Sequence, residues 1–74
     1  MSDDCKKAML KYIVHELGLV SHILFYIQFY NISDKYSKEI SEISDKVDNL
    51  TDKIKGLILT NRYDEFFKEG GKNE

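Results

Sequence analysis

The side chains that could do chemistry are few and stand apart: one cysteine, Cys5, and two histidines, His15 and His22. His15 is followed by Glu16, which is how the helical zinc-protease signature begins, but the position of the second ligand holds Leu19. The two histidines are two helical turns apart, about 10 Å along one axis, which is too far to share a metal ion. No phosphate loop, nucleophile elbow or C-x-x-C pair is present. We therefore expect no enzymatic activity, no metal and no cofactor.

The charged residues are almost balanced, with a formal net charge of −2 over 74 residues. No basic block exists, so binding of nucleic acid, although open through Lys6, Lys7 and Lys11, is unsupported by charge. A single cysteine permits no disulfide within the chain, and a basic and then apolar leader is absent after Met1. We expect a cytoplasmic protein.

A short motif, Ile or Leu followed by Ser or Thr, Asp and Lys, occurs three times in the second half of the chain, beginning at Ile32, Ile43 and Leu50. The steps of 11 and 7 residues add to five turns of a helix, so the three copies of the motif lie on the same side of that helix. The apolar series that it belongs to predicts a helical contact seam, which needs a partner. Its members are Ile32, Tyr36, Ile40, Ile43, Val47, Leu50, Ile54 and Leu57.

The seam has the form of a coiled-coil heptad. Its a positions are Ile40, Val47 and Ile54, and its d positions are Ile43, Leu50 and Leu57. β-Branched residues at a with mainly Leu at d are typical of parallel two-stranded coils, but the flanking e positions hold no charges that would fix an orientation. The seam is expected to pack on the first helix, on another chain, or on both.

The first helix is expected over about residues 3–30, with Ser2 as its N-cap. From Leu17 to Ser33 it has 17 residues without a formal charge, which is typical of a helix buried in protein or lipid. Such a run spans roughly 25 Å, short of the hydrocarbon thickness of a bilayer, so a protein environment is favoured over a membrane-spanning one.

A break is expected between Asn31 and Asp34, where Asn31 or Ser33 is predicted to cap a second helix of about residues 33–60. Without Gly or Pro there, one continuous helix remains an alternative. The apolar stripes on the two sides of the break would then face opposite ways, so an antiparallel hairpin is favoured because it hides more apolar surface. Asn61 with Asp64 predicts either a kink or a short third helix over about 62–69, and residues 70–74 are a predicted flexible tail.

The sequence thus predicts one all-α domain, a long antiparallel two-helix hairpin with a possible short third helix, completed by a partner chain into a bundle. We expect a non-catalytic protein–protein interaction module that is either an accessory subunit of a larger complex or a homo-oligomer. The alternatives are an accessory factor of a nucleic-acid-processing machinery and a membrane-associated protein. The predicted partner-binding residues are Leu17, Val20, Leu24, Phe25, Tyr26, Phe29, Tyr30, Ile40, Ile43, Val47, Leu50, Ile54 and Leu57.

Overall fold

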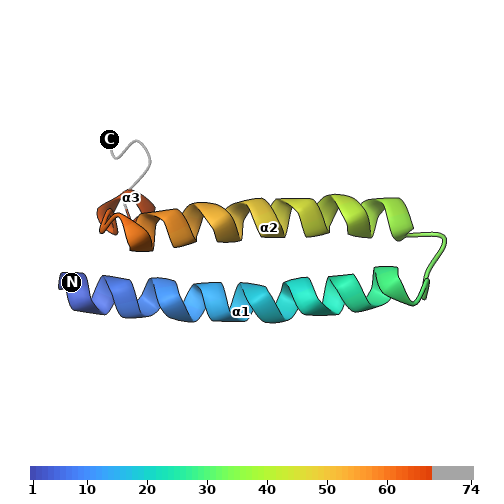
Figure 1. The fold of residues 1–74 in the computed structure, drawn as a ribbon, viewed down its shortest axis with the longest axis horizontal. Helices are drawn as coiled ribbons and strands as arrows, with labels where there is room; N and C mark the ends of the chain where they lie inside the picture. Colours follow the sequence, from blue (N-terminus) through green and yellow to red (C-terminus); the bar gives the residue numbers. More distant parts are fainter. Residues whose placement is uncertain (68–74) are drawn as a thin grey trace.

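The computed structural model describes residues 1–67 of the chain, which form three helices and no strand. Helix α1 spans Asp3–Phe29, α2 spans Ser37–Leu59 and α3 spans Asp64–Phe67. Helices α1 and α2 lie antiparallel and side by side, and α3 sits at the end where α1 begins (Figure 1). The predicted all-α hairpin with a short third helix is confirmed, and the continuous helix is excluded. The predicted residues 68–69 of the third helix and the predicted tail at 70–74 lie outside the described residues.

Helix α1 begins as the sequence predicts. The Ser2 hydroxyl accepts a hydrogen bond from the backbone N–H of Cys5 at 3.2 Å, and Asp3 and Asp4 occupy the first turn. The cap satisfies one of the free N–H groups of the first turn, and the two carboxylates complement the positive end of the helix dipole. The start of the longest helix is therefore fixed by local residues.

Both long helices end on an asparagine in the left-handed region, Asn31 with φ 51° and Asn61 with φ 56°. After α1, the N–H of Ile32 donates to the carbonyl of Ile27 at 3.1 Å and the N–H of Asn31 donates to the carbonyl of Gln28 at 3.2 Å. This pair of bonds is the Schellman motif, which satisfies carbonyls that the helix end leaves free.

Helix α2 ends in the same way, with the N–H of Arg62 donating to the carbonyl of Leu57 at 2.9 Å. The prediction that Asn31 and Asn61 cap the following helices is therefore wrong: each closes the preceding helix. Asparagine can do both because its short polar side chain tolerates the left-handed conformation as well as the N-cap position.

Helix α2 starts at Ser37, later than the predicted residue 33. The Ser33 hydroxyl accepts from the N–H of Tyr36 at 3.3 Å and shapes the turn, while the residue at the helix N-cap, Tyr36, makes no side-chain capping bond. The reason is geometric, because after Asn31 the chain must cross the 8–10 Å that separates two packed helix axes before it can turn back.

The core of the hairpin lies at the end remote from the turn. Among residues 1–67 only three hydrophobic side chains are buried: Leu10 at 0%, Ile54 at 1% and Tyr63 at 7% exposure. The Tyr63 hydroxyl donates to the side-chain oxygen of Asn61 at 2.6 Å, and the ammonium of Lys6 pairs with Asp64 across this end. Half-buried neighbours complete the cluster: Ile13, Val14, Leu17, Ile58 and Phe67.

Candidate interaction surface

Helix α2 faces α1 with a different set of residues from the predicted a/d seam. The a residues Ile40, Val47 and Ile54 are half-buried or buried, but the d residues Ile43 and Leu50 are each 46% exposed. The contact face is completed instead by the e positions, Ser44, Thr51 and Ile58, all half-buried. Two of these three are small and polar, so the middle of the helix–helix contact contributes little apolar burial.

Helix α1 turns toward α2 a regular row with steps of 4, 3, 4, 3 and 4. The row consists of Leu10, Val14, Leu17, Ser21, Leu24 and Gln28, all buried or half-buried. At its middle the Ser21 hydroxyl donates to the Asp48 carboxylate at 2.8 Å. Only Leu10 of this 27-residue helix is fully buried, so most of its apolar surface is left uncovered within the chain.

The structure divides the predicted partner-binding residues into two groups rather than gathering them on one surface. Those that are buried or half-buried are Leu17, Leu24, Ile40, Val47, Ile54 and Leu57; those exposed are Val20, Phe25, Tyr26, Phe29, Tyr30, Ile43 and Leu50. Four further exposed large apolar residues of α1 were not in the predicted set, namely Met9, Tyr12, Leu19 and Ile23. They are not members of the α1 row, and the helical period that defines the row could have placed them outside.

Four exposed aromatic residues at the turn end of α1 form what we call the aromatic cluster: Phe25, Tyr26, Phe29 and Tyr30. Their exposures run from 52% to 67%. The rings of Phe25 and Phe29 stack at 5.6 Å between centroids, Tyr26 and Tyr30 lie 4.7 Å apart, and Phe29 meets Tyr30 edge-on at 5.0 Å. The rings thus pack on each other while their outer surfaces remain in water.

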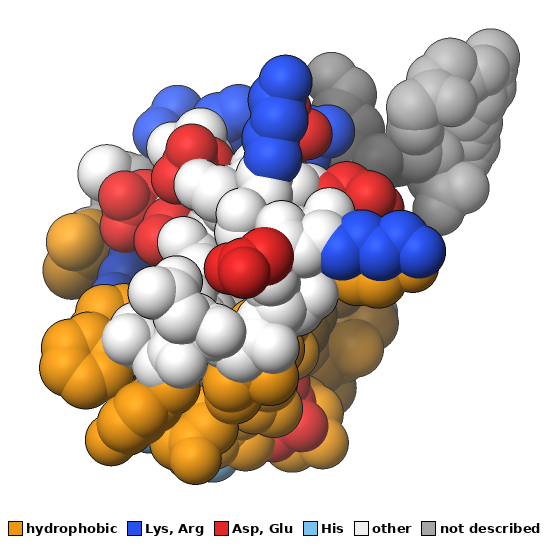
Figure 2. Space-filling model, turned by 90° about the vertical axis from the view of Figure 1, so that its right-hand side faces the viewer, with side chains coloured by type: hydrophobic (Ala, Val, Ile, Leu, Met, Phe, Trp, Pro, Cys, Tyr) orange, Lys and Arg blue, Asp and Glu red, His pale blue; other side chains and the backbone are white. Residues whose placement is uncertain are grey.

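The charged side chains gather elsewhere. Viewed from the turn end, hydrophobic side chains cover the α1 half of the surface and charged ones cover the α2 half (Figure 2). The two helices are therefore unlike: α2 has one apolar face and one charged face, whereas α1 has apolar residues on both its inner and its outer side. A helix apolar on both sides is typical of one buried on both sides.

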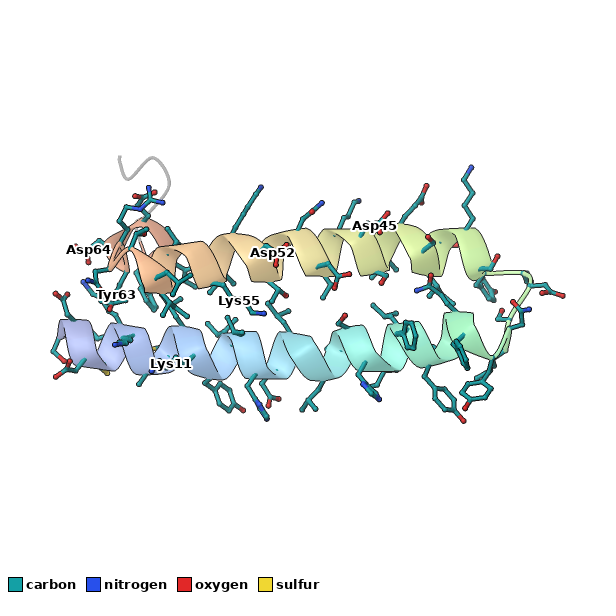
Figure 3. The ribbon with its side chains drawn as sticks, in the orientation of Figure 1. Lys11, Asp45, Asp52, Lys55, Tyr63 and Asp64 are labelled. Atoms are coloured by element: carbon teal, nitrogen blue, oxygen red, sulfur yellow. The ribbon has the colours of Figure 1, made fainter. Side chains whose placement is uncertain are left out.

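One long side of the hairpin holds a polar groove of about 360 Å³. Gly18 and Ser21 of α1 line it opposite Asp48, Asp52 and Lys55 of α2. In Figure 3 Lys55 lies between the two helices, near α1. Two carboxylates and one lysine give the groove a net negative charge, which does not suit a phosphate backbone, and Lys6 is already paired with Asp64.

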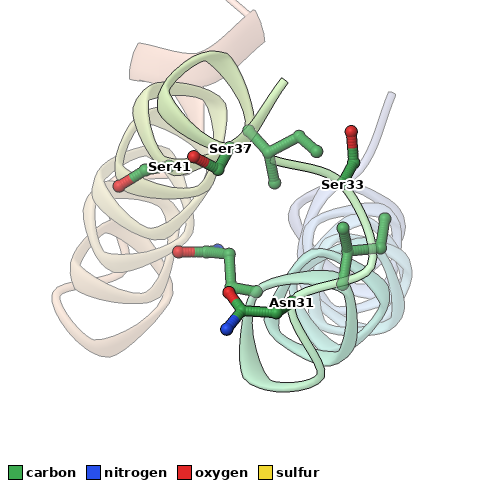
Figure 4. A pocket seen from close by; sticks show the side chains of 7 residues that line it. Asn31, Ser33, Ser37 and Ser41 are labelled. Carbon is green, nitrogen blue, oxygen red and sulfur yellow. The ribbon is translucent and has the colours of Figure 1, made fainter. Parts of the chain in front are cut away.

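A second hollow, of about 240 Å³, lies at the turn (Figure 4). Hydroxyls of Ser33, Ser37 and Ser41 and the amides of Gln28 and Asn31 line it. It offers hydrogen bonds to a small polar molecule, but no carboxylate, histidine or lysine lines it to activate a hydroxyl. Across residues 1–67 no three His, Cys, Asp or Glu side chains are grouped as a metal site.

The Lys6–Asp64 pair changes the titration of Lys6. The hydrogen bond to the Asp64 carboxylate raises the pKa of Lys6 above its usual 10.5, and partial desolvation of the ammonium opposes the rise. The charge of Asp64 and that of Asp3 act in the same direction as the hydrogen bond. The pair holds α3 against the start of α1 and belongs to the fold rather than to a reactive site.

By length and composition alone, α1 is apolar enough to cross a membrane, a property it shares with core helices of soluble proteins and with signal sequences. Little of that helix is buried within the hairpin. Its outer side therefore suits any apolar environment, whether protein or lipid.

No protein-family model, no curated protein and no solved structure matches this chain.

Proposed function

We propose that the chain is a non-catalytic interaction module whose aromatic cluster docks on another protein. The observation that carries the proposal is the solvent exposure of four mutually packed rings on a helix that is also apolar on its inner side. At about 60% exposure and 150–250 Å² for each ring, the cluster presents roughly 350–600 Å². That is the size of the largest apolar patch on a typical monomer, and such patches are often functional.

The composition of the cluster suits a protein partner. Tyr and Phe are enriched at the centre of interfaces, where they bring large area with only two rotatable bonds each. The hydroxyls of Tyr26 and Tyr30 can find hydrogen-bond acceptors at a wet rim, which an aliphatic patch could not do. A standard interface takes about 800 Å² from each partner, so the cluster by itself supplies roughly half to three quarters of one side.

The test is affinity capture from the native cell with three immobilised proteins. The first is the wild type, the second is Phe25→Ser with Phe29→Ser, and the control is Lys38→Ser with Glu42→Ser on the outward face of α2 near the same end. We expect the aromatic variant to lose at least about tenfold of one or more captured proteins, because two anchors of about 2 kcal/mol each are removed. The control should retain them. Far-UV circular dichroism must show that all three proteins are equally helical.

If no captured protein distinguishes the aromatic variant from the wild type, the proposal is wrong.

A second candidate, binding to a lipid surface, is favoured by the length and apolarity of α1. Flotation with vesicles of phosphatidylcholine and phosphatidylserine separates the two, because a lipid-bound hairpin floats without any protein partner and loses flotation when the rings are replaced.

A further inference from the structure

A second surface, on the long side of the hairpin opposite the polar groove, spans both helices. Residues of α2 that line the groove, such as Asp48 and Lys55, each follow a residue that faces α1. Ile43, Leu50 and Leu57 each precede a facing residue, so they project on the other side of α2.

The same rule holds on α1. Gly18, which lines the groove, follows the facing residue Leu17. Ile13, Val20 and Ile27 each precede a facing residue, and so they project on the side away from the groove. We call the six residues Ile13, Val20, Ile27, Ile43, Leu50 and Leu57 the apolar side. It is distinct from the aromatic cluster.

The six residues form three rungs across the hairpin. The hydrogen bond from Ser21 to Asp48 sets the level of α1 against α2. Residue numbers at one level therefore add to about 69 or 70. The rungs are Ile13 with Leu57, Val20 with Leu50, and Ile27 with Ile43, and successive rungs are about 10 Å apart along the axis.

We propose that the apolar side is the dimer interface of this chain, and that the second copy is related by a two-fold axis parallel to the helices. Stacked in this way, α1 of one copy lies over α2 of the other at the same level. Each rung then packs on the same rung of the second copy, with its α1 residue against the α2 residue of that copy. Val20 of one copy therefore packs on Leu50 of the other. The result is a four-helix bundle with both turns at one end.

The charges at the edge of the apolar side select this axis. Glu16 and Lys53 each precede a facing residue and share one level, so in the proposed dimer Glu16 of one copy lies near Lys53 of the other. A two-fold axis perpendicular to the helices would instead stack α2 on α2 and bring Lys46 of one copy against Lys53 of the other. Opposite charges set register and like charges exclude the wrong one.

The area also fits a second copy. Helix α2 has 23 residues and is about 35 Å long, and two helices side by side are about 20 Å wide. One long side of the hairpin therefore offers about 700 Å², close to the roughly 800 Å² that each partner gives to a standard interface. Leu50 and Ile43 have nearly half of their surface left to bury.

The experiment is sedimentation equilibrium of the purified full chain over a range of concentrations. Leu50→Asp places a charge on the apolar side, and the matched control Asn49→Asp places the same charge one residue away on the exposed outward face of α2. We expect the wild type to be a dimer, Leu50→Asp to raise the dimer dissociation constant at least about 100-fold, and Asn49→Asp to leave it within about threefold. Because Leu50 is 46% exposed in one chain, its variant is expected to remain a folded monomer.

The axis is tested by charge reversal. Glu16→Lys alone should weaken the dimer several-fold, and Glu16→Lys combined with Lys53→Glu should restore it. A wild type that stays monomeric at about 100 μM, or a Leu50→Asp variant that dimerises as well as the wild type, overturns the interface. Failure of the double variant to recover overturns the axis.

The two proposals fail separately because their surfaces do not overlap. A monomer that still loses a captured protein when Phe25 and Phe29 are replaced would remove the dimer and leave the proposed function. If the chain dimerises but its aromatic variant captures the same proteins as the wild type, the proposed function is wrong and the dimer remains.

Discussion

The burial of Leu10 gives the sharpest test of the fold, because a matched leucine lies on the other side of the same helix. Leu10 is 0% exposed and packs in the core, whereas Leu19 is 51% exposed. Leu10→Ala removes buried methyl groups and leaves a cavity, which typically costs 2–5 kcal/mol. Leu19→Ala removes a half-exposed side chain and substitutes a better helix former, so its cost should stay below about 1 kcal/mol.

The size of the chain makes this difference large. At about 0.05–0.15 kcal/mol per residue, 74 residues have a total stability of roughly 4–11 kcal/mol. Leu10→Ala should therefore remove about a fifth or more of the free energy of unfolding and lower the urea midpoint in proportion, with an unchanged slope. Urea unfolding followed by far-UV circular dichroism measures both variants.

Equal destabilisation by the two substitutions would refute the reasoning. If Leu19→Ala destabilised the chain as much as Leu10→Ala, the outer side of α1 would be buried under the conditions of the assay. If Leu10→Ala cost less than about 1 kcal/mol, the packing of α3 and the end of α2 around Leu10 would be wrong.

Two further predictions follow from the helix ends and the ion pair. Replacing Asn31 by Gly should raise the free energy of unfolding by up to about 1 kcal/mol and replacement by Val should lower it by about 1–2 kcal/mol, because the backbone of residue 31 is left-handed; thermal unfolding measures both variants. The raised pKa of Lys6 means that its contribution to stability is complete below its usual value of 10.5 and is lost as the pH rises through the raised value. Urea unfolding from about pH 9 to pH 12 should therefore show a decline at the alkaline end that Lys6→Met diminishes, and an identical decline in that variant would contradict the assignment.

The fold class was within reach of the sequence because helical periodicity is a strong, local signal. The phase difference between the stripes on the two sides of Asn31 predicts a hairpin, and the structure has one. The helix ends were less accessible, since Asn31 and Asn61 satisfy both N-cap and left-handed C-terminal patterns, and only the bonds to Gln28 and Ile58 decide between them.

The face that α2 turns to α1 could not be derived from its own apolar pattern. An a/d seam fits a partner helix of similar pattern, but α1 presents the small polar residue Ser21 in the middle of its contact row. Ser21 bonds Asp48 at this point, and α2 is turned so that Thr51 faces inward and Leu50 is left at the side. The rotation depends on both helices together, which is why a pattern read along one helix misses it.

The uneven distribution of buried residues has a consequence for how the hairpin opens. Leu10, Ile54 and Tyr63 enclose one end, the polar bond between Ser21 and Asp48 lies at the middle, and the facing residues at the turn end are only half-buried. Amide hydrogen exchange should accordingly be slowest near Leu10 and Ile54 and fastest beside the turn, so that the helices fray from the turn inward without melting the closed end. A molecule that binds near the turn would then stabilise the part of the hairpin that is least stable by itself. Its binding would be detected as slower amide exchange beside the turn, far from Leu10 and Ile54.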